Sequence, residues 1–286
     1  MQNRGIIWLA SYPKSGNTWL RAFLANYMRD PEAPLPINEL VGYTLGDGFL
    51  IHYERMTGRT AEELTEPELH RLRPKMHEWL AISKGQMVYV KTHSLIAQIG
   101  GTPLITPSAT VGAIYILRNP LDVALSYGHH YRTGLDQAVE DLCRRNHMVP
   151  GGPRTLPQYL GSWSQHVLSW VDAPGLAPHV MRYEDMTAAP EAAFETLTRF
   201  LRWPPEPERL KKAVAFSSFD ELSGQEQTTA FKEQPAGGPT RFFRAGQTGG
   251  WREALSEAQV ARMIEANGEV MRRFGYLSDR GEPLDG

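Results

Sequence analysis

The feature that most constrains this chain is a short apolar run that leads through a polar turn into an amphipathic segment. Residues 6–10 (IIWLA) precede the turn at residues 11–16 (SYPKSG), and apolar side chains then recur at helical spacing from Trp19 to Tyr27. This pattern predicts a buried strand, a loop and a helix. Because the start of a helix presents backbone N–H groups and the positive end of the helix dipole, the segment is suited to bind an anion.

Further apolar runs predict more strands of the same sheet. They cover residues 87–90 and 111–117. Residues 179–183 are another candidate strand, and a helical pattern follows at residues 190–201. Continuous apolar runs that alternate with helices are typical of a parallel sheet covered on both faces. We therefore predict an α/β fold, with a central parallel sheet flanked by helices, in a single domain over residues 1–286.

Basic side chains follow the first three predicted strands. Lys14 follows the first, Lys91 and His93 follow the second, and Arg118 follows the third. In open α/β sheets the ligand binds outside the carboxyl ends of the strands. The sequence thus predicts a local anion site, although the formal net charge of the whole chain is only −2 and excludes a global polybasic character.

Several classes of function and location are disfavoured. Cys143 is the single cysteine, which excludes an internal disulfide and a multi-cysteine zinc site. The spacing of His129, His130 and His166 does not demand a metal either. The apolar stretch at the N-terminus is too short for a signal peptide, and no run is long enough to span a membrane. We expect a cytoplasmic protein without a metal and without nucleic-acid or membrane partners.

The turn at residues 11–16 is not a Walker A loop. That motif places its lysine after the second glycine, whereas here Lys14 precedes Gly16. Nucleotide hydrolysis also requires Mg²⁺ held by acidic partners, and the first three strand ends supply no carboxylate. Lys14 as a fixed charge and Thr18 as a hydroxyl donor therefore favour an anionic nucleotide bound without a metal.

Seven motifs follow one another along the chain. They are SYPKSGNTW at 11–19, KTH at 91–93, LRNPLDVALSYGHH at 117–130, GSWSQHVLSW at 161–170, RYEDM at 182–186, SSF at 217–219 and FRAGQTGGW at 243–251. This ordered set resembles the sulfotransferases that use 3′-phosphoadenosine 5′-phosphosulfate (PAPS). It looks like the cytosolic-type, bacterial-looking members and is similar to the glycopeptide antibiotic sulfotransferases, which modify natural products.

The resemblance implies a P-loop-like first loop that wraps the 5′-phosphosulfate. It also implies that Arg118 and Ser126 hold the 3′-phosphate, in agreement with the fork of donors that arginine offers to phosphate oxygens. The flat rings of Trp19, Tyr183 and Phe219 would sandwich the adenine. The loop at residues 243–251, called the late loop, would close over the 3′-phosphate with Arg244 and Gly246. The implied PAPS-binding residues are Lys14, Ser15, Gly16, Asn17, Thr18, Trp19, Arg118, Ser126, Tyr183, Ser217, Phe219, Arg244, Ala245 and Gly246.

The reaction that the resemblance implies is direct in-line transfer of the sulfuryl group to an acceptor, with PAP as the product. His93 matches the general base, a role that suits an imidazole with a pKa near neutrality. Lys14 would stabilise the departing phosphate oxygen, and Lys91 would neutralise the sulfuryl oxygens. Neither a metal nor a covalent intermediate is required.

Two departures from the family pattern concern the late loop. Ala245 stands where the family often has lysine, and Gly250 where aspartate commonly precedes Trp251. These changes predict weaker or differently shaped 3′-phosphate binding. The dimer motif of vertebrate cytosolic members is not reproduced at residues 252–261, so a monomer and a homodimer both stay open.

The acceptor is the least constrained part of the prediction. Lid-like segments are expected at residues 128–161 and 225–246, and residues 31–85 are expected to form irregular loops and short helices. The aromatic residues of the variable segments favour a small-molecule acceptor that is partly aromatic and carries a hydroxyl, or an amine. These residues are Tyr43, Phe49, Tyr53 and Tyr131. The alternatives are a non-catalytic PAP- or PAPS-binding module and an enzyme resembling a nucleotide kinase.

Some conspicuous residues also have purely structural interpretations. Trp163, Trp170 and Trp251 are expected to pack in the core or at its rim, because tryptophan buries a large surface. His166 has no assigned role. The acidic stretch at residues 62–68 is expected to be the solvated start of a helix.

Overall fold

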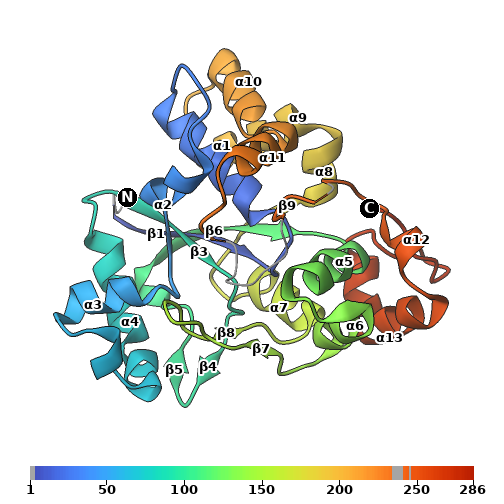
Figure 1. Ribbon diagram of the computed structural model, residues 1–286, viewed down its shortest axis with the longest axis horizontal. Coiled ribbons are helices and arrows are strands. Elements are labelled where there is room, and N and C mark those ends of the chain that lie inside the picture. Colours follow the sequence, from blue (N-terminus) through green and yellow to red (C-terminus); the bar gives the residue numbers. More distant parts are fainter. Residues whose placement is uncertain (1–3, 234–240, 245) are drawn as a thin grey trace. The chain divides into compact units, whose positions relative to one another are not determined.

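The computed structural model describes residues 4–233, 241–244 and 246–286, and Figure 1 shows their helices and strands. The chain forms two compact units. The first contains residues 1–12, 44–115 and 144–180, and the second contains residues 13–43, 116–143 and 181–286. Each unit is thus assembled from three separate stretches of the chain.

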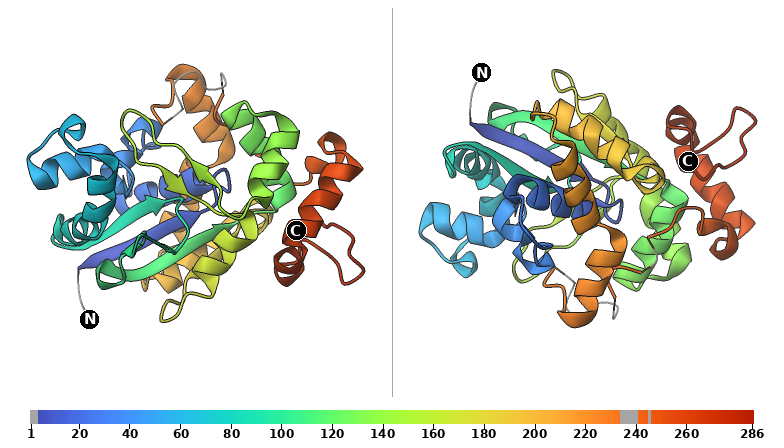
Figure 2. Two further views of the ribbon diagram at one scale, coloured as in Figure 1. Left: turned by 90° about the horizontal axis from the view of Figure 1, so that it is seen from below. Right: turned by 90° about the horizontal axis from the view of Figure 1, so that it is seen from above.

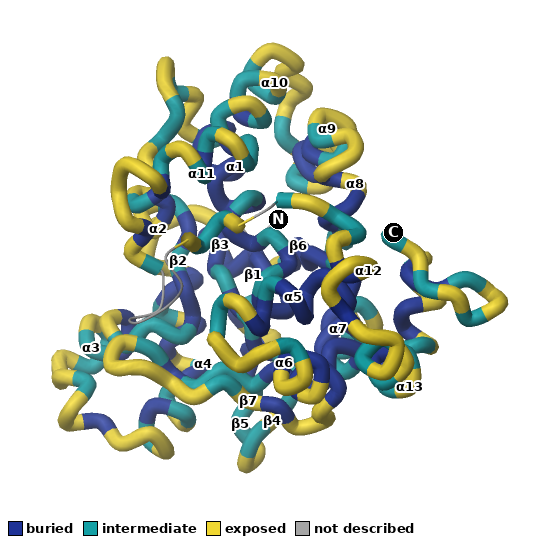
Figure 3. The backbone as a smooth tube through the Cα atoms, turned by 45° about the vertical axis from the view of Figure 1, so that its right-hand side comes forward, coloured by how far each residue is buried: buried dark blue, intermediate teal, exposed yellow. Residues whose placement is uncertain are grey.

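The main sheet has five strands, which are β1 (Gly5–Ser11), β2 (Thr44–Gly46), β3 (Met87–Thr92), β6 (Thr110–Leu117) and β9 (His179–Arg182), in the order β2-β3-β1-β6-β9. Strands β1 and β3 run parallel, with Gly5 opposite Met87 and Ala10 opposite Thr92. All seven residues of β1 are buried, and Figure 3 shows the strand in the colour of buried residues. A strand buried on both faces needs a continuous apolar run, so the predicted α/β class with a central parallel sheet flanked by helices is confirmed.

The first unit holds β1, β2 and β3, together with most of β6 and the start of β9. Figure 2 shows β1, β3 and β6 side by side from two further directions. The remaining elements of this unit are α3 (Leu50–Thr57), the 3₁₀ helix η2 (Ala61–Glu63), α4 (Glu66–Ile82), β4 (Gln98–Ile99), β5 (Thr102–Pro103), η3 (Pro107–Ala109), β7 (Met148–Val149), β8 (Gln158–Tyr159) and α7 (Trp163–Val171).

The second unit consists mainly of helices. The predicted helix after the first loop is α1 (Asn17–Arg29), which packs within this unit. The other helices are η1 (Ile37–Glu39), α2 (Leu40–Tyr43), α5 (Pro120–Tyr131), α6 (Gly134–Cys143), α8 (Tyr183–Ala188), α9 (Pro190–Phe200), α10 (Pro207–Phe216), α11 (Phe219–Thr228), α12 (Trp251–Ala254) and α13 (Glu257–Arg273).

The expectation of only loops and short helices between residues 31 and 85 is wrong for α4. This helix has 17 residues and tolerates Pro74 in its interior, where a proline usually breaks a helix. Its start is strongly specified by a capping box, in which Thr65 and Glu68 exchange hydrogen bonds between side chain and backbone. The interpretation of residues 62–68 as a helix start is confirmed, because α4 begins at Glu66.

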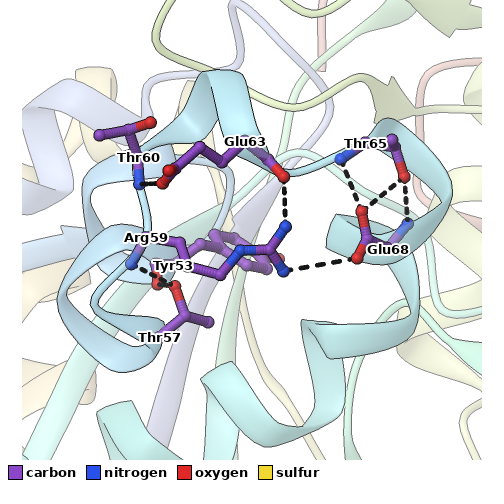
Figure 4. Close-up of polar contacts among 7 residues, drawn as sticks. All are labelled: Tyr53, Thr57, Arg59, Thr60, Glu63, Thr65 and Glu68. Carbon is purple, nitrogen blue, oxygen red and sulfur yellow. Dashed lines mark hydrogen bonds and ion pairs between the residues drawn. The ribbon is translucent and has the colours of Figure 1, made fainter.

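An arginine joins the two turns that precede and open α4. Arg59 donates from Nη1 to Glu68 Oε1 at 3.4 Å and from Nη2 to the carbonyl oxygen of Glu63. Figure 4 shows how these contacts connect the two capping boxes, one at Thr60 and one at Thr65. The exposed acidic stretch is therefore ordered by local hydrogen bonds rather than by burial.

Candidate active site

The loop between β1 and α1 is held in a conformation that few residue types can adopt. Lys14 has a φ of 69° and Gly16 a φ of 109°, both in the left-handed region that favours glycine. A Cβ atom on Gly16 would lie 2.8 Å from Cδ2 of Tyr183. Only glycine therefore fits at the position immediately before α1.

The same loop has the properties of an anion site. Ser15 is 1% exposed, and within the described part of the chain its Oγ makes no hydrogen bond. Asn17 and Thr18 form the first turn of α1, which contains no acidic residue. The orphaned hydroxyl lies beside a helix N-terminus, where N–H groups and the helix dipole favour a negative charge. These residues fit a phosphate or sulfate group.

Arg118 ties this loop to the late loop. Its Nη1 donates to the carbonyl oxygen of Lys14 at 3.0 Å, and its Nη2 donates to that of Gln247 at 3.0 Å. The guanidinium lies 4.1 Å from the ring centroid of Tyr183, a cation–π distance, and its Nε is buried without a hydrogen-bond partner among the described residues. Both loops are thus attached to one cation.

The charge of Lys14 lies on an aromatic face. Its Nζ is 3.6 Å from the ring centroid of Phe242. The backbone N–H groups of Phe242 and Phe243 both donate to the carboxylate of Glu226, the second at 2.9 Å. Glu226 therefore fixes the backbone that presents this ring to Lys14.

The rings predicted to contact adenine lie in the same unit. The Trp19 and Tyr183 rings meet edge to face, with centroids 5.8 Å apart. Phe219 packs against the late loop, where a Cβ on Gly246 would come within 2.5 Å of its ring. Gly246 has a φ of 62°, so glycine is required there by conformation and by space.

The late loop is anchored by a residue that sequence reasoning missed. Asp122, in the first turn of α5, accepts hydrogen bonds from the backbone N–H of Gly249 at 2.8 Å and of Trp251 at 3.1 Å. Burial raises the pKa of its carboxyl. The sequence signal that could have identified Asp122 is an acidic residue just after the proline that starts a helix.

Of the late-loop residues, Arg244 is exposed and Ala245 lies outside the described residues.

Two serines that were predicted to bind PAPS differ in their surroundings. Ser126 is half-buried on α5. Ser217 is fully buried, and its hydroxyl donates to the carbonyl oxygen of Ala213 at 2.8 Å. The proton of Ser217 is therefore used within the C-terminal end of α10, which leaves its oxygen as an acceptor.

Lys91 and His93 lie in the first unit, at the end of β3. Lys91 is half-buried and pairs in register with Leu9 of β1. His93 Nδ1 lies 2.8 Å from the carbonyl oxygen of Ser11. A carbonyl only accepts, so in neutral His93 the proton is on Nδ1 and the lone pair is on Nε2. That tautomer can accept a proton at Nε2.

The structure thus groups the predicted residues in two sets. In the second unit it connects Lys14, Gly16, Arg118 and Tyr183 through the contacts above, and in the first unit it holds His93 on Ser11. Residues 4–233, 241–244 and 246–286 contain no group of three or more His, Cys, Asp or Glu that could hold a metal. None of the helices described is long and apolar enough to cross a membrane.

Comparison with known proteins identifies relatives over nearly the whole chain. A family model described as "Sulfotransferase domain" matches residues 5–275. Sulfotransferase 1A1 of Canis lupus familiaris is 25% identical over 270 residues, which is 89% of this chain and 79% of the relative.

Two solved structures share the fold. Mouse sulfotransferase SULT7A1 complexed with PAP matches with a TM-score of 0.59 and 22% identity, covering 97% of this chain and 87% of that one. Retinol dehydratase in a complex with retinol and PAP matches with a TM-score of 0.63 and 20% identity, covering 93% of this chain and 81% of that one.

Proposed function

The chain belongs to the sulfotransferase family, and from this premise we propose that it transfers the sulfuryl group of PAPS to a hydroxyl, or an amine, of a small-molecule acceptor. PAPS supplies the activated sulfuryl group, and PAP is the product. The observation that carries the proposal is the anion-binding loop, in which Ser15 Oγ has no hydrogen bond among the described residues and Arg118 holds the Lys14 carbonyl.

The residues of the second unit provide for both charged ends of the donor. The first turn of α1, with Ser15 and Lys14, would hold the 5′-phosphosulfate, because its N–H groups and the ammonium favour anionic oxygens. Arg118, with Ser126 and the late loop, would hold the 3′-phosphate through charge-assisted hydrogen bonds. The rings of Trp19, Tyr183 and Phe219 offer flat faces to a base.

His93 is proposed as the general base. With Nδ1–H donated to the Ser11 carbonyl, Nε2 can remove the acceptor proton as the acceptor attacks. Ser11 precedes Lys14 by three residues, so chain connectivity alone limits the distance between their Cα atoms to about 11 Å. Lys91 and Lys14 would stabilise negative charge that develops during transfer.

The acceptor is proposed to be a partly aromatic small molecule. Retinol, which is bound in the retinol dehydratase complex, is an apolar molecule with a hydroxyl, and such a ligand suits the aromatic residues of the variable segments. Tyr53 is excluded from that set because it is fully buried. A cytoplasmic location, a natural-product acceptor and the lid-like segments at 128–161 and 225–246 remain predictions. Residues 234–240 and 245 of the second segment lie outside the described residues.

The proposal is tested with ³⁵S-labelled PAPS and a panel of phenols, sugars, amines and peptides, together with calorimetric titration of PAP. We expect transfer to at least one acceptor and binding of PAP. His93→Ala should keep PAP binding and lose about 10²-fold or more in the transfer rate, and an undiminished rate would refute the assignment of the base.

The outcomes distinguish the alternatives. PAP binding without transfer to any acceptor would identify a non-catalytic binding module. Mg²⁺-dependent turnover of ATP would identify an enzyme resembling a nucleotide kinase. Absence of both transfer and PAP binding would refute the proposed function altogether.

A further inference from the structure

One face of helix α7 contacts the backbone just after β3. His166, Ser169 and Trp170 are spaced at i, i+3 and i+4, so they share one face of the helix. His166 Nε2 lies 3.0 Å from the His93 carbonyl oxygen, and Trp170 Nε1 donates to that of Ser94 at 3.1 Å. The backbone N–H of Ile96 donates to Ser169 Oγ at 3.0 Å.

For residues 93–96 these bonds take the place of the hydrogen bonds that a neighbouring strand would make. Strand β3 ends at Thr92, and buried backbone groups beyond a strand end must find other partners. The backbone N–H of Ser94 donates to Thr92 Oγ1 at 3.1 Å, and that of Leu95 donates to the Tyr159 carbonyl oxygen at 2.8 Å. Side chains of α7 satisfy two carbonyls and one N–H of residues 93–96.

The direction of each bond at His166 follows from the chemistry of its partner. Because the His93 carbonyl only accepts, His166 Nε2 carries the proton and Nδ1 carries the lone pair. Nδ1 lies 2.9 Å from the Tyr115 hydroxyl, which therefore donates to it. The backbone N–H of Tyr12 donates in turn to the Tyr115 oxygen.

The hydrogen-bond network returns through Tyr12 to Ser11, the last residue of β1, which precedes the anion-binding loop. Tyr12 follows Ser11, and the Ser11 carbonyl accepts the Nδ1 proton of His93. The ring of His93 is thereby attached to β1 and its backbone to His166 of α7, and Tyr115 of β6 holds His166 in turn. His166 and Trp170 are each 0% exposed, so water does not compete for their bonds.

We propose that this face of α7, together with Tyr115, positions His93 for proton abstraction. The inference rests on the proposed function, in which His93 is the general base. A base must be held within about 0.5 Å of its productive geometry by groups that are themselves fixed. An apolar helix face could cover residues 93–96 equally well, but it would leave their carbonyls without donors.

The protonation state of His166 serves the same purpose. Burial lowers the pKa of its imidazole to about 4, so the ring is neutral at physiological pH. A neutral ring donates a hydrogen bond to the His93 backbone without adding a positive charge beside the base, where such a charge would oppose protonation.

Kinetics of matched variants test the proposal. His166→Leu removes the donor, and we expect kcat to fall about 10-fold to 100-fold, as is typical for groups that orient a functional residue, with the PAP dissociation constant changed less than about 2-fold. His166→Gln should restore most of kcat, because its amide N–H can reach the same carbonyl. Val167→Ala creates a cavity in the same helix and is the control for a loss of stability without a loss of the hydrogen bond.

Comparison with that control decides between positioning and packing. Val167 is 0% exposed, and its truncation should lower the melting temperature while leaving kcat per PAP-binding site unchanged. If His166→Leu and Val167→Ala lose kcat to the same extent, or if His166→Gln restores nothing, the proposal is refuted. Should His166→Leu fail to fold, Tyr115→Phe provides a milder change, with a smaller loss of kcat in the same direction.

A spectroscopic measurement is independent of transfer. In protein labelled with ¹⁵N-histidine, long-range ¹H–¹⁵N spectra report which ring nitrogen carries the proton. We expect the Nδ1–H tautomer for His93 and the Nε2–H tautomer for His166, and a shift in the His93 tautomer in His166→Leu but not in His166→Gln. The opposite tautomers in the wild-type protein would overturn the positioning network, whereas absence of transfer with these tautomers would overturn only the proposed function.

Discussion

Replacing His166 by glutamine should make the protein less sensitive to acid. The imidazole is fully buried, and burial lowers its pKa from 6.5 to about 4. Between these pH values the unfolded chain binds a proton at this residue that the folded chain does not bind. The free energy of unfolding therefore decreases as the pH falls from 6.5 towards 4, and His166→Gln removes this contribution.

The size of the effect follows from the shift in pKa. Each pKa unit corresponds to about 1.4 kcal/mol, so the full contribution of His166 is about 3 kcal/mol, and about 2 kcal/mol of it is lost by pH 5. Burial also lowers the pKa values of His52 and His77. Both residues are present in both proteins, so their contributions cancel in the difference between wild type and variant.

Urea denaturation at pH 7 and pH 5 measures this difference. We expect the advantage of the wild type over His166→Gln in free energy of unfolding to be smaller by about 2 kcal/mol at pH 5 than at pH 7. His129→Gln, on an exposed site of α5, controls for the loss of a histidine. An advantage that stays constant or grows on acidification would refute the assignment of a buried neutral imidazole.

Three further substitutions test other contacts. Gly16→Ala would place a methyl 2.8 Å from Tyr183 at a φ of 109°. Because this strain costs the loop about 1–3 kcal/mol, we expect calorimetry to show that the variant binds PAP about 10-fold or more weakly. An unchanged affinity would contradict the assignment of the loop to PAP binding. Arg73→Met leaves the buried Asp47 without its ion-pair partner at 3.1 Å and should cost about 3–5 kcal/mol in urea denaturation; an unchanged midpoint would refute this. Phe194→Ala leaves a cavity at a site that is 0% exposed. It should lower the free energy of unfolding in urea by about 3–5 kcal/mol, and a loss below about 1 kcal/mol would contradict this prediction.

Strands β1, β3 and β6 were predictable because each contains a continuous apolar run, whereas β2 (Thr44–Gly46) contains none and was not predicted. The run at residues 6–10 became β1 (Gly5–Ser11), and the run at 111–117 became β6 (Thr110–Leu117). The start of helix α4 was expected at residues 62–68, but its length was not predicted, because Pro74 and the polar residues around it obscure its periodicity. Local signals of this kind depend on neighbouring residues and can be recognised without the fold.

The contacts that organise the site could not be predicted in the same way. Arg118 donates to the carbonyl of a residue 104 positions away, and Asp122 accepts from the N–H of a residue 127 positions away. Such side-chain-to-backbone bonds leave no periodic pattern, since they depend on the register of distant segments. For the same reason the sequence could associate Trp170 only with packing, whereas its indole N–H donates to the carbonyl of Ser94.

The partners of the cations explain how a chain with a net charge of −2 can present a positive site. Arg21 and Arg73 are buried with carboxylates, those of Glu233 and Asp47, so their charges are compensated where they lie. Arg118 instead gives its hydrogen bonds to two carbonyl oxygens. Exchanging a neutral carbonyl for a phosphate oxygen makes a hydrogen bond stronger, whereas an arginine already paired with a carboxylate gains little from a second anion. In the proposed function, the neutral hydrogen-bond partners of Arg118 would therefore favour the binding of an anionic ligand, a property that the charge total does not reveal.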